Sequence, residues 1–324
     1  MADQKRQTKR ATRAERRAAE AAAEQARAEQ AAKERKQQTI IGMVVIGIII
    51  VLVAVASFAV WRATHANNET QQANSITVDE AYEELQKVEN KPARADDKAG
   101  FLISQNGYGS KVEDAPTLSI YMEPLCPGCA SVNRQLDPTL IKLVDAGQLN
   151  LDLHFMTFQD SKSSDEYSTR AFNAAVYIAE HDDDPNHLLN YLANIYAEDF
   201  QPGELSNYTS VSNDKLKRQA VDAGVDQDVA DAAFSGDYEY KTWLKAADAY
   251  TIRREELFSS SGSFSSPTLA INNQYWPLTN VSLANMTLVD GFLKAIGLEA
   301  DQAGVAGDMP SIGSNGDPIS ITTE

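Results

Sequence analysis

The two cysteines of this 324-residue chain, Cys126 and Cys129, stand three positions apart in the stretch Leu125–Cys129 (LCPGC). A disulfide between them would enclose two residues and restrain the unfolded chain little, so a purely structural bridge explains the pair poorly. Structural zinc takes four ligands, and the sequence has no second Cys-x-x-Cys motif. Two thiolates could still bind Cu(I).

A redox-active pair accounts best for this spacing. Pro127 needs no backbone N–H and therefore suits the first turn of a helix, which would place Cys126 at the helix N-terminus. Free N–H groups and the positive end of the helix dipole stabilise a thiolate there. Cys126 could then attack another sulfur or be attacked by it, and Cys129, one turn further along, could resolve the mixed disulfide.

The elements on either side of the pair follow from the apolar pattern. Thr117–Met122 (TLSIYM) is rich in apolar and β-branched residues and predicts a buried strand. Spaced apolar positions after Cys129 predict a helix that ends at Gly147, and residues 149–158 predict a second strand. Residues 117–158 are therefore expected to form a β-α-β unit.

The remainder of the folded region is expected to be mostly helical. Residues 166–258 show helical periodicity and no strand pattern, which predicts a helical insertion over about 165–258. Pro267 follows a Ser-rich loop and precedes residues 268–276, which predict a strand, a tight turn and a strand. A closing helix is expected over residues 287–296.

An apolar run near the N-terminus is a candidate membrane span. Residues 40–61 carry no charge and would extend about 33 Å as a helix, close to the hydrocarbon thickness of a bilayer. Lys and Arg are concentrated before this run, in residues 1–38, which predicts a cytoplasmic N-terminus. Ala54–Ala56 (AVA) resembles a signal-peptide cleavage site, but the long charged segment before it favours an uncleaved anchor.

The composition excludes some classes of function. The chain has 46 acidic and 29 basic residues, and the acidic excess lies beyond the apolar run. Such a surface repels nucleic acid and anionic lipid headgroups, so we expect no nucleic-acid partner. Five segments are expected in order: a cytoplasmic charged arm (1–38), a transmembrane signal-anchor (39–62), a polar tether (63–75), a folded domain (76–298) and a disordered acidic tail (299–324).

Three segments carry a resemblance to a known family: "DAPTLSIYMEPLCPGC" (Asp114–Cys129), "EYSTRAFNAA" (Glu166–Ala175) and "SSPTLAINNQYW" (Ser265–Trp276). In this order the chain resembles the thioredoxin superfamily, and more closely its DsbA-like branch in membrane-anchored forms of Gram-positive bacteria. The resemblance covers roughly residues 76–298. It implies an α/β thioredoxin fold with a helical insertion, preceded by a single N-terminal transmembrane helix.

The resemblance also implies roles for individual residues. Cys126 would be the exposed nucleophile and Cys129 its buried partner, with their redox-active disulfide and no separate cofactor or metal. Pro267 would be a cis-proline beside this disulfide, and the Ser266 backbone would face an extended substrate. The implied partners are unfolded or partly folded exported proteins, together with a membrane redox partner that recycles the pair.

Two features depart from the strongly oxidising relatives. The dipeptide Pro127-Gly128 stands where those relatives carry His, so no side chain between the cysteines stabilises a thiolate. Glu123, three residues before Cys126, would raise the pKa of that thiol if its carboxylate pointed inward. Glu123 could instead accept a proton from Cys129, or be a solvated charge at the end of a loop.

The sequence therefore predicts a membrane-tethered, extracytoplasmic thiol-disulfide oxidoreductase that forms or shuffles disulfides in exported proteins. It would be a single-pass protein of the cell membrane with a cytoplasmic N-terminus. We expect the protein to oxidise substrates rather than reduce or isomerise them, and to be a weaker oxidant than DsbA. The sequence leaves the direction of electron flow open. The alternative is a non-catalytic thioredoxin-fold binding module or a Cu(I) carrier at the cell surface.

Overall fold

A mixed β-sheet organises residues 76–322, which are the residues that this computed structural model describes. Its strands are β1 (Phe101–Ser104), β2 (Gly107–Tyr108), β3 (Thr117–Met122), β4 (Asn150–Phe155), β5 (Thr268–Ile271) and β6 (Gln274–Tyr275). They lie side by side in the order β2-β1-β4-β3-β5-β6. The central pair, β3 and β4, is parallel, and the other neighbouring strands are antiparallel.

The predicted β-α-β unit is confirmed. Helix α3 (Pro127–Asp145) connects β3 to β4, which pair in parallel register from Thr117 opposite Asn150 to the ends of both strands. Parallel neighbours need such a crossover because a tight turn cannot join them. Both strands are buried along nearly their whole length, which explains the continuous apolar run of β3.

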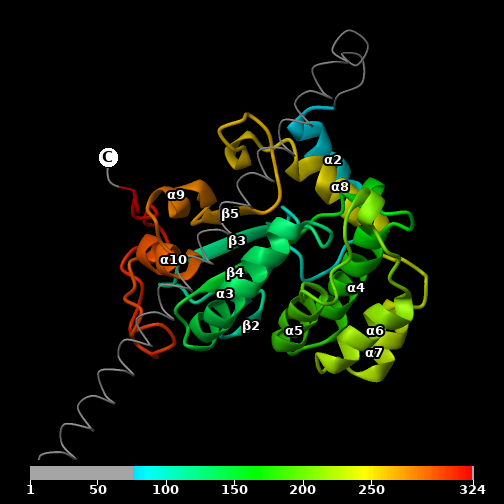
Figure 1. Cartoon of the computed structure of the whole chain (residues 1–324), viewed down its shortest axis with the longest axis horizontal. Helices are drawn as coiled ribbons and strands as arrows, with labels where there is room; N and C mark the ends of the chain where they lie inside the picture. The colour runs from blue at the N-terminus through cyan, green and yellow to red at the C-terminus, as the bar shows by residue number, and fades with distance from the viewer. Residues whose placement is uncertain (1–75, 323–324) are drawn as a thin grey trace, which may run out of the picture. The chain divides into compact units, whose positions relative to one another are not determined.

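The predicted helical insertion is also confirmed. Between β4 and β5 the chain forms helices that gather beside the sheet in Figure 1: α4 (Tyr167–His181), α5 (Pro185–Ile195), α6 (Asn213–Asp222), α7 (Gln227–Ala233) and α8 (Lys241–Thr251), with 3₁₀ turns η1 (Asp160–Lys162), η2 (Leu205–Asn207) and η3 (Glu255–Leu257). Phe172 of α4 packs on Phe155 of β4, with ring centroids 5.0 Å apart. The insertion therefore shares a hydrophobic core with the sheet.

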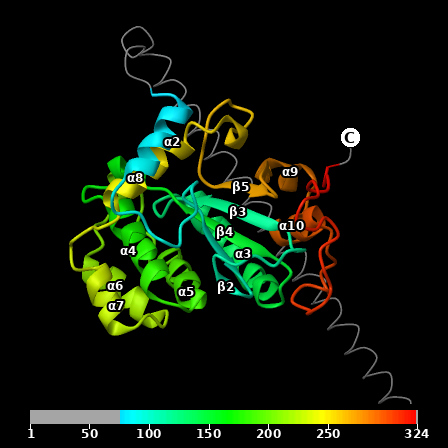
Figure 2. The ribbon, with the colours of Figure 1, turned by 180° about the vertical axis from the view of Figure 1, so that it is seen from behind.

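Helices at both ends of the domain complete the packing. α2 (Val78–Lys87) lies beside α8 (Figures 1 and 2). Tyr82 of α2 and Tyr250 of α8 approach to 5.3 Å between ring centroids. Thr77 and Glu80 form a reciprocal capping box that starts α2. After β6 come α9 (Leu278–Leu283) and the predicted closing helix, α10 (Leu288–Ile296), which packs against α3.

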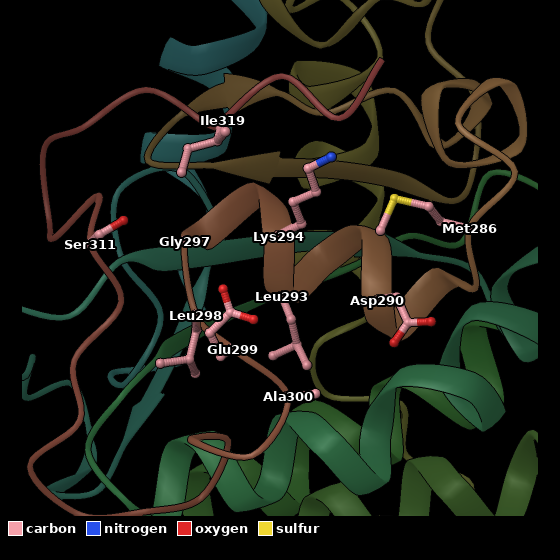
Figure 3. A pocket seen from close by; sticks show the side chains of 10 residues that line it. All are labelled: Met286, Asp290, Leu293, Lys294, Gly297, Leu298, Glu299, Ala300, Ser311 and Ile319. Atoms are coloured by element: carbon pink, nitrogen blue, oxygen red, sulfur yellow. The ribbon is translucent and has the colours of Figure 1, made fainter. Parts of the chain in front are cut away.

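The prediction of a disordered tail over residues 299–324 is wrong for the part that the structure describes, 299–322. The Gln148 side chain donates hydrogen bonds to the carbonyls of Gln302 and Val305, at 2.9 and 3.1 Å, and Ile321 is 5% exposed. Figure 3 shows the tail returning beside α10, with a hollow between them. The tail is ordered because side chains distant in the sequence satisfy its backbone carbonyls.

The predictions for the N-terminal region fall outside the described residues. The charged arm at 1–38, the apolar run at 40–61 and the tether at 63–75 all precede residue 76, and they stay predictions. Within residues 76–322, none of the helices combines the length and the apolar character that crossing a bilayer requires.

We predict that Gln148→Ala lowers the free energy of unfolding by about 1–3 kcal/mol, because tail carbonyls and the Gly304 N–H would lose a buried partner. Urea denaturation of the full-length chain measures this change. Asn315→Ala, at an exposed tail position, is the matched control and should leave the midpoint unchanged. Equal midpoints for all three proteins would show that the tail contacts do not stabilise the domain.

Candidate active site

The cysteine pair lies at the junction between β3 and α3. Cys126 is the N-cap residue of α3, with φ −70° and ψ 116°, and Pro127 occupies the first helical position. A turn in which the Cys126 N–H donates to the Glu123 carbonyl at 3.1 Å joins strand to helix. The sulfur of Cys126 therefore faces the unpaired N–H groups and the positive end of the α3 dipole, as predicted.

The two thiols have opposite acidities. A hydrogen bond from the Cys129 thiol is the largest cause that lowers the pKa of Cys126, to about 7, and burial opposes it. Burial is the largest cause that raises the pKa of Cys129 well above its ordinary value. At neutral pH, Cys126 is thus poised to be the thiolate, whereas Cys129 keeps its proton.

The expectation that Cys126 would be exposed is wrong. Cys126 is 6% exposed and Cys129 is 3% exposed, so both members of the pair are buried. The Cys126 thiol donates to the Ser266 carbonyl at 3.3 Å on one side. On another side, the Gln201 amide donates to the Cys126 carbonyl at 3.1 Å. The insertion covers the pair, and this packing has no signal in the local sequence around the cysteines.

Pro267 lies directly against the first turn of α3. The Ser266–Pro267 peptide bond is cis. A Cβ atom added to Gly128 would stand 3.0 Å from the Pro267 Cδ and 3.6 Å from the Cys126 sulfur. Glycine between the cysteines therefore lets the proline loop approach the sulfur closely.

Glu123 is fully buried beneath the pair, so its interpretation as a solvated charge is wrong. Its carboxylate accepts hydrogen bonds from the Leu125 N–H at 2.7 Å and from the Ser168 hydroxyl of α4. Its own backbone N–H donates to the Cys129 sulfur at 3.4 Å. Burial is the largest cause that raises the pKa of Glu123 well above its ordinary value. When ionised, this carboxylate also raises the pKa of Cys129.

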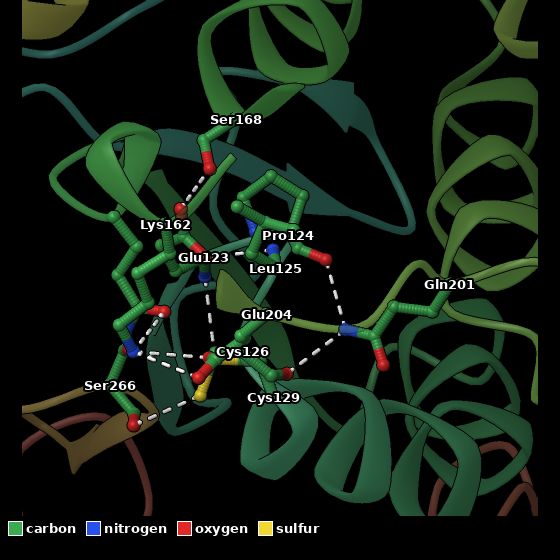
Figure 4. Close-up of polar contacts among 11 residues, drawn as sticks. Glu123, Pro124, Leu125, Cys126, Cys129, Lys162, Ser168, Gln201, Glu204 and Ser266 are labelled. Atoms are coloured by element: carbon green, nitrogen blue, oxygen red, sulfur yellow. Dashed lines mark hydrogen bonds and ion pairs between the residues drawn. The ribbon is translucent and has the colours of Figure 1, made fainter. Parts of the chain in front are cut away.

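Figure 4 shows side chains around the pair that the sequence did not single out. Gln201 donates to the Pro124 carbonyl at 2.9 Å as well as to that of Cys126. Lys162 and Glu204 form an ion pair beside the cysteine loop, with both N–O distances 3.1 Å. These residues are at least 36 positions from Cys126 in the sequence. Only the docking of the insertion on the sheet brings them to the site.

The described residues hold no cluster of three or more side chains of the kinds that usually bind metals, which are His, Cys, Asp and Glu. The chemistry that the site itself supports is sulfur exchange, since an acidic thiol and a less acidic thiol lie in contact.

Comparisons with known proteins agree with this architecture. A family model described as thioredoxin matches residues 108–276. Among curated proteins, the serine/threonine-protein kinase PknE of Mycobacterium tuberculosis is 38% identical over 98 residues, which are 30% of this chain and 17% of the kinase. The chain thus matches less than a fifth of the length of that relative.

Solved structures that match part of this chain include two bacterial proteins. Reduced DsbA from Mycobacterium tuberculosis is 26% identical, and the match covers 55% of this chain and 84% of that one at a TM-score of 0.44. MdbA from Actinomyces oris, a thiol-disulfide oxidoreductase, is 17% identical, with coverages of 64% and 95% and a TM-score of 0.45.

We predict that the Cys126 thiolate of the reduced full-length protein forms with a midpoint near pH 7, measured by absorbance at 240 nm. Cys129→Ala removes the hydrogen bond that lowers this pKa most, so its midpoint should move to higher pH. Cys126→Ala is the control and should lack the transition. If the transition persists in that variant, it does not belong to Cys126.

We also predict that Glu123→Gln changes the pH dependence of stability. The native protein holds the Glu123 proton to a higher pH than the unfolded chain does, so wild-type stability falls as pH rises above the ordinary carboxyl pKa. Glutamine cannot ionise, and the stability of the variant relative to wild type should therefore be greater at pH 8 than at pH 5. Urea unfolding at both pH values measures this.

The control for that experiment is Glu198→Gln, at an exposed position. Its stability relative to wild type should be the same at both pH values. If the stability of Glu123→Gln relative to wild type were also the same at both pH values, Glu123 would not be held protonated in the native state.

Proposed function

Because the chain belongs to the thioredoxin family, we propose that it is a thiol-disulfide oxidoreductase whose redox pair is Cys126 and Cys129. The observation that carries the proposal is the unequal acidity of the two thiols at the start of one helix. An acidic thiol is a good leaving group, and a neighbouring thiol can resolve the mixed disulfide. A structural disulfide would need neither property.

In the oxidising direction, the reaction begins with a Cys126–Cys129 disulfide. A substrate thiolate attacks the Cys126 sulfur, a mixed disulfide forms, and Cys129 leaves with the electron pair of the broken bond. A second substrate thiolate then attacks the substrate sulfur of the mixed disulfide and releases Cys126. Two substrate thiols become one disulfide, the enzyme gains two electrons, and the two protons of the substrate thiols are released or taken up by the enzyme thiolates.

The surroundings of the pair support different steps of this exchange. The Glu123 N–H donates to the Cys129 sulfur and would stabilise the charge that appears there when the disulfide opens. The helix N-terminus would stabilise Cys126 when it leaves the substrate. Ser266 and Pro267 would border the path of an extended substrate, which needs room beside Cys126.

The strength of the oxidant follows from the acidity of Cys126. A pKa of about 7 lies nearer that of thioredoxin, about 7, than that of DsbA, about 3.5. A less stabilised thiolate favours the reduced state less, so we propose a weaker oxidant than DsbA. Disulfide donation would leave the pair reduced, and a membrane redox partner or a small oxidant would have to reoxidise it.

We propose that the protein works outside the cytoplasm, tethered by residues 40–61, on exported proteins that are not yet folded. The charge asymmetry around the apolar run supports this orientation. An oxidising compartment is also where newly exported chains need disulfides.

The test is oxidative refolding of reduced ribonuclease by the full-length protein in a glutathione buffer. We expect catalysis by the wild type and at least about a hundredfold slower turnover for Cys126→Ser, which lacks the attacking sulfur. Cys129→Ser should accumulate mixed disulfides with the substrate, because Cys129 can no longer attack the Cys126 sulfur and release the substrate thiol. Non-reducing gels and mass spectrometry detect them.

Urea unfolding of both variants is the control for a correct fold. Wild-type protein that leaves ribonuclease unchanged, yet binds Cu(I) in a one-to-one complex, would replace the proposed activity with that of a metal carrier. Mixed disulfides that form through Cys129 in the Cys126→Ser variant would reverse the roles of the two cysteines.

A further inference from the structure

Hydrogen bonds link the side chains on one side of Cys126 into a chain. The Cys126 thiol donates to the Ser266 carbonyl, and the Ser266 hydroxyl accepts from the Gln159 amide at 3.3 Å. The oxygen of the Gln159 amide accepts from the Lys162 ammonium at 3.0 Å. These contacts connect the proline loop before β5 with the segment that follows β4.

A segment of the insertion closes this chain into a ring. The Lys162 ammonium binds both carboxylate oxygens of Glu204, each at 3.1 Å. Three residues earlier, Gln201 donates to the carbonyls of Cys126 and Pro124. We call the enclosing residues the polar ring: Ser266, Gln159, Lys162, Glu204 and Gln201.

The polar ring limits access to the reactive sulfur. Cys126 is 6% exposed, whereas the side chains of Lys162 and Glu204 are 26% and 24% exposed. Solvent therefore reaches the ion pair, although it barely reaches the Cys126 sulfur. Figure 4 shows this pair beside Cys126. A substrate sulfur that bonds to Cys126 would bring its neighbouring residues close to this ion pair.

The carboxylate of Glu204 acts on the reactive sulfur. Its negative charge is among the causes that raise the pKa of Cys126, against the larger lowering effect of Cys129. A partly buried charge is screened less by water and salt than an exposed one. The residues flanking a substrate cysteine would feel the same charge.

We propose that Glu204 is a specificity-determining residue of the exchange reaction, held in place by Lys162, and that it favours substrate cysteines with basic neighbours over those with acidic neighbours. This inference rests on the proposed function. A substrate Lys or Arg can share the Glu204 carboxylate with Lys162, and the same carboxylate offsets the Lys162 ammonium, which would otherwise attract a substrate Asp or Glu.

The experiment uses the oxidised full-length protein and three short peptides, each with one cysteine flanked by Lys, Gln or Glu. Acid quenching followed by mass spectrometry measures the rate at which each peptide opens the Cys126–Cys129 disulfide. The rate for each variant is divided by the wild-type rate with the same peptide, so that the intrinsic reactivity of the peptide thiol cancels.

We expect Glu204→Gln to slow the Lys-flanked peptide by about fivefold and to accelerate the Glu-flanked peptide by a similar factor, with the Gln-flanked peptide changed less than about twofold. Glu204→Asp keeps the charge and should retain the preference of the wild type. Both effects should shrink in about 1 M salt, where the Debye length is about 3 Å.

The matched control is Glu198→Gln, which removes the same charge from an exposed position of the same inter-helix segment. It should leave all three rates unchanged. The inference would be overturned if Glu204→Gln changed the rates of all three peptides by the same factor. It would also be overturned if Glu198→Gln produced the same dependence on peptide charge. Wild-type protein that reacts with none of the peptides would instead contradict the proposed function itself.

Discussion

The start of α3 is the feature on which the chemistry of this protein depends. Cys126 caps the helix and its sulfur faces unpaired N–H groups, whereas Cys129 lies inside the first turn, and both residues are buried. The same short stretch thereby lowers the pKa of one thiol and raises that of the other. This helix begins where it does because β3 ends at Met122 and Pro127 starts a new element.

The sheet brings the second part of the site to that helix. β5 runs antiparallel to β3, with Thr268 opposite Tyr121, so the residues just before β5 arrive beside the end of β3. Pro267 then meets Gly128, which has no Cβ to keep it away. The pairing of two strands nearly 150 positions apart thus decides what the reactive sulfur contacts.

The helical insertion contacts the active site in two places. Below the cysteines, Ser168 of α4 binds the buried Glu123 carboxylate, and this contact compensates part of the cost of burying a carboxyl group. On the open side, Gln201 and Glu204 enclose Cys126. A thioredoxin-family sheet alone would leave the pair more open, so the insertion sets both the access to the site and the charge at its entrance.

Much of the fold and the core of the site could be predicted from local sequence. Apolar runs, the position of Pro127 and the spacing of the cysteines indicate the β-α-β unit and the redox pair, because periodicity and helix-start preferences act over a few residues. The burial of Cys126 and Glu123, the polar ring and the order of residues 299–322 depend on contacts between distant segments. Only the tertiary structure decides these, because a charge or carbonyl finds its partner by packing and not by proximity in the chain.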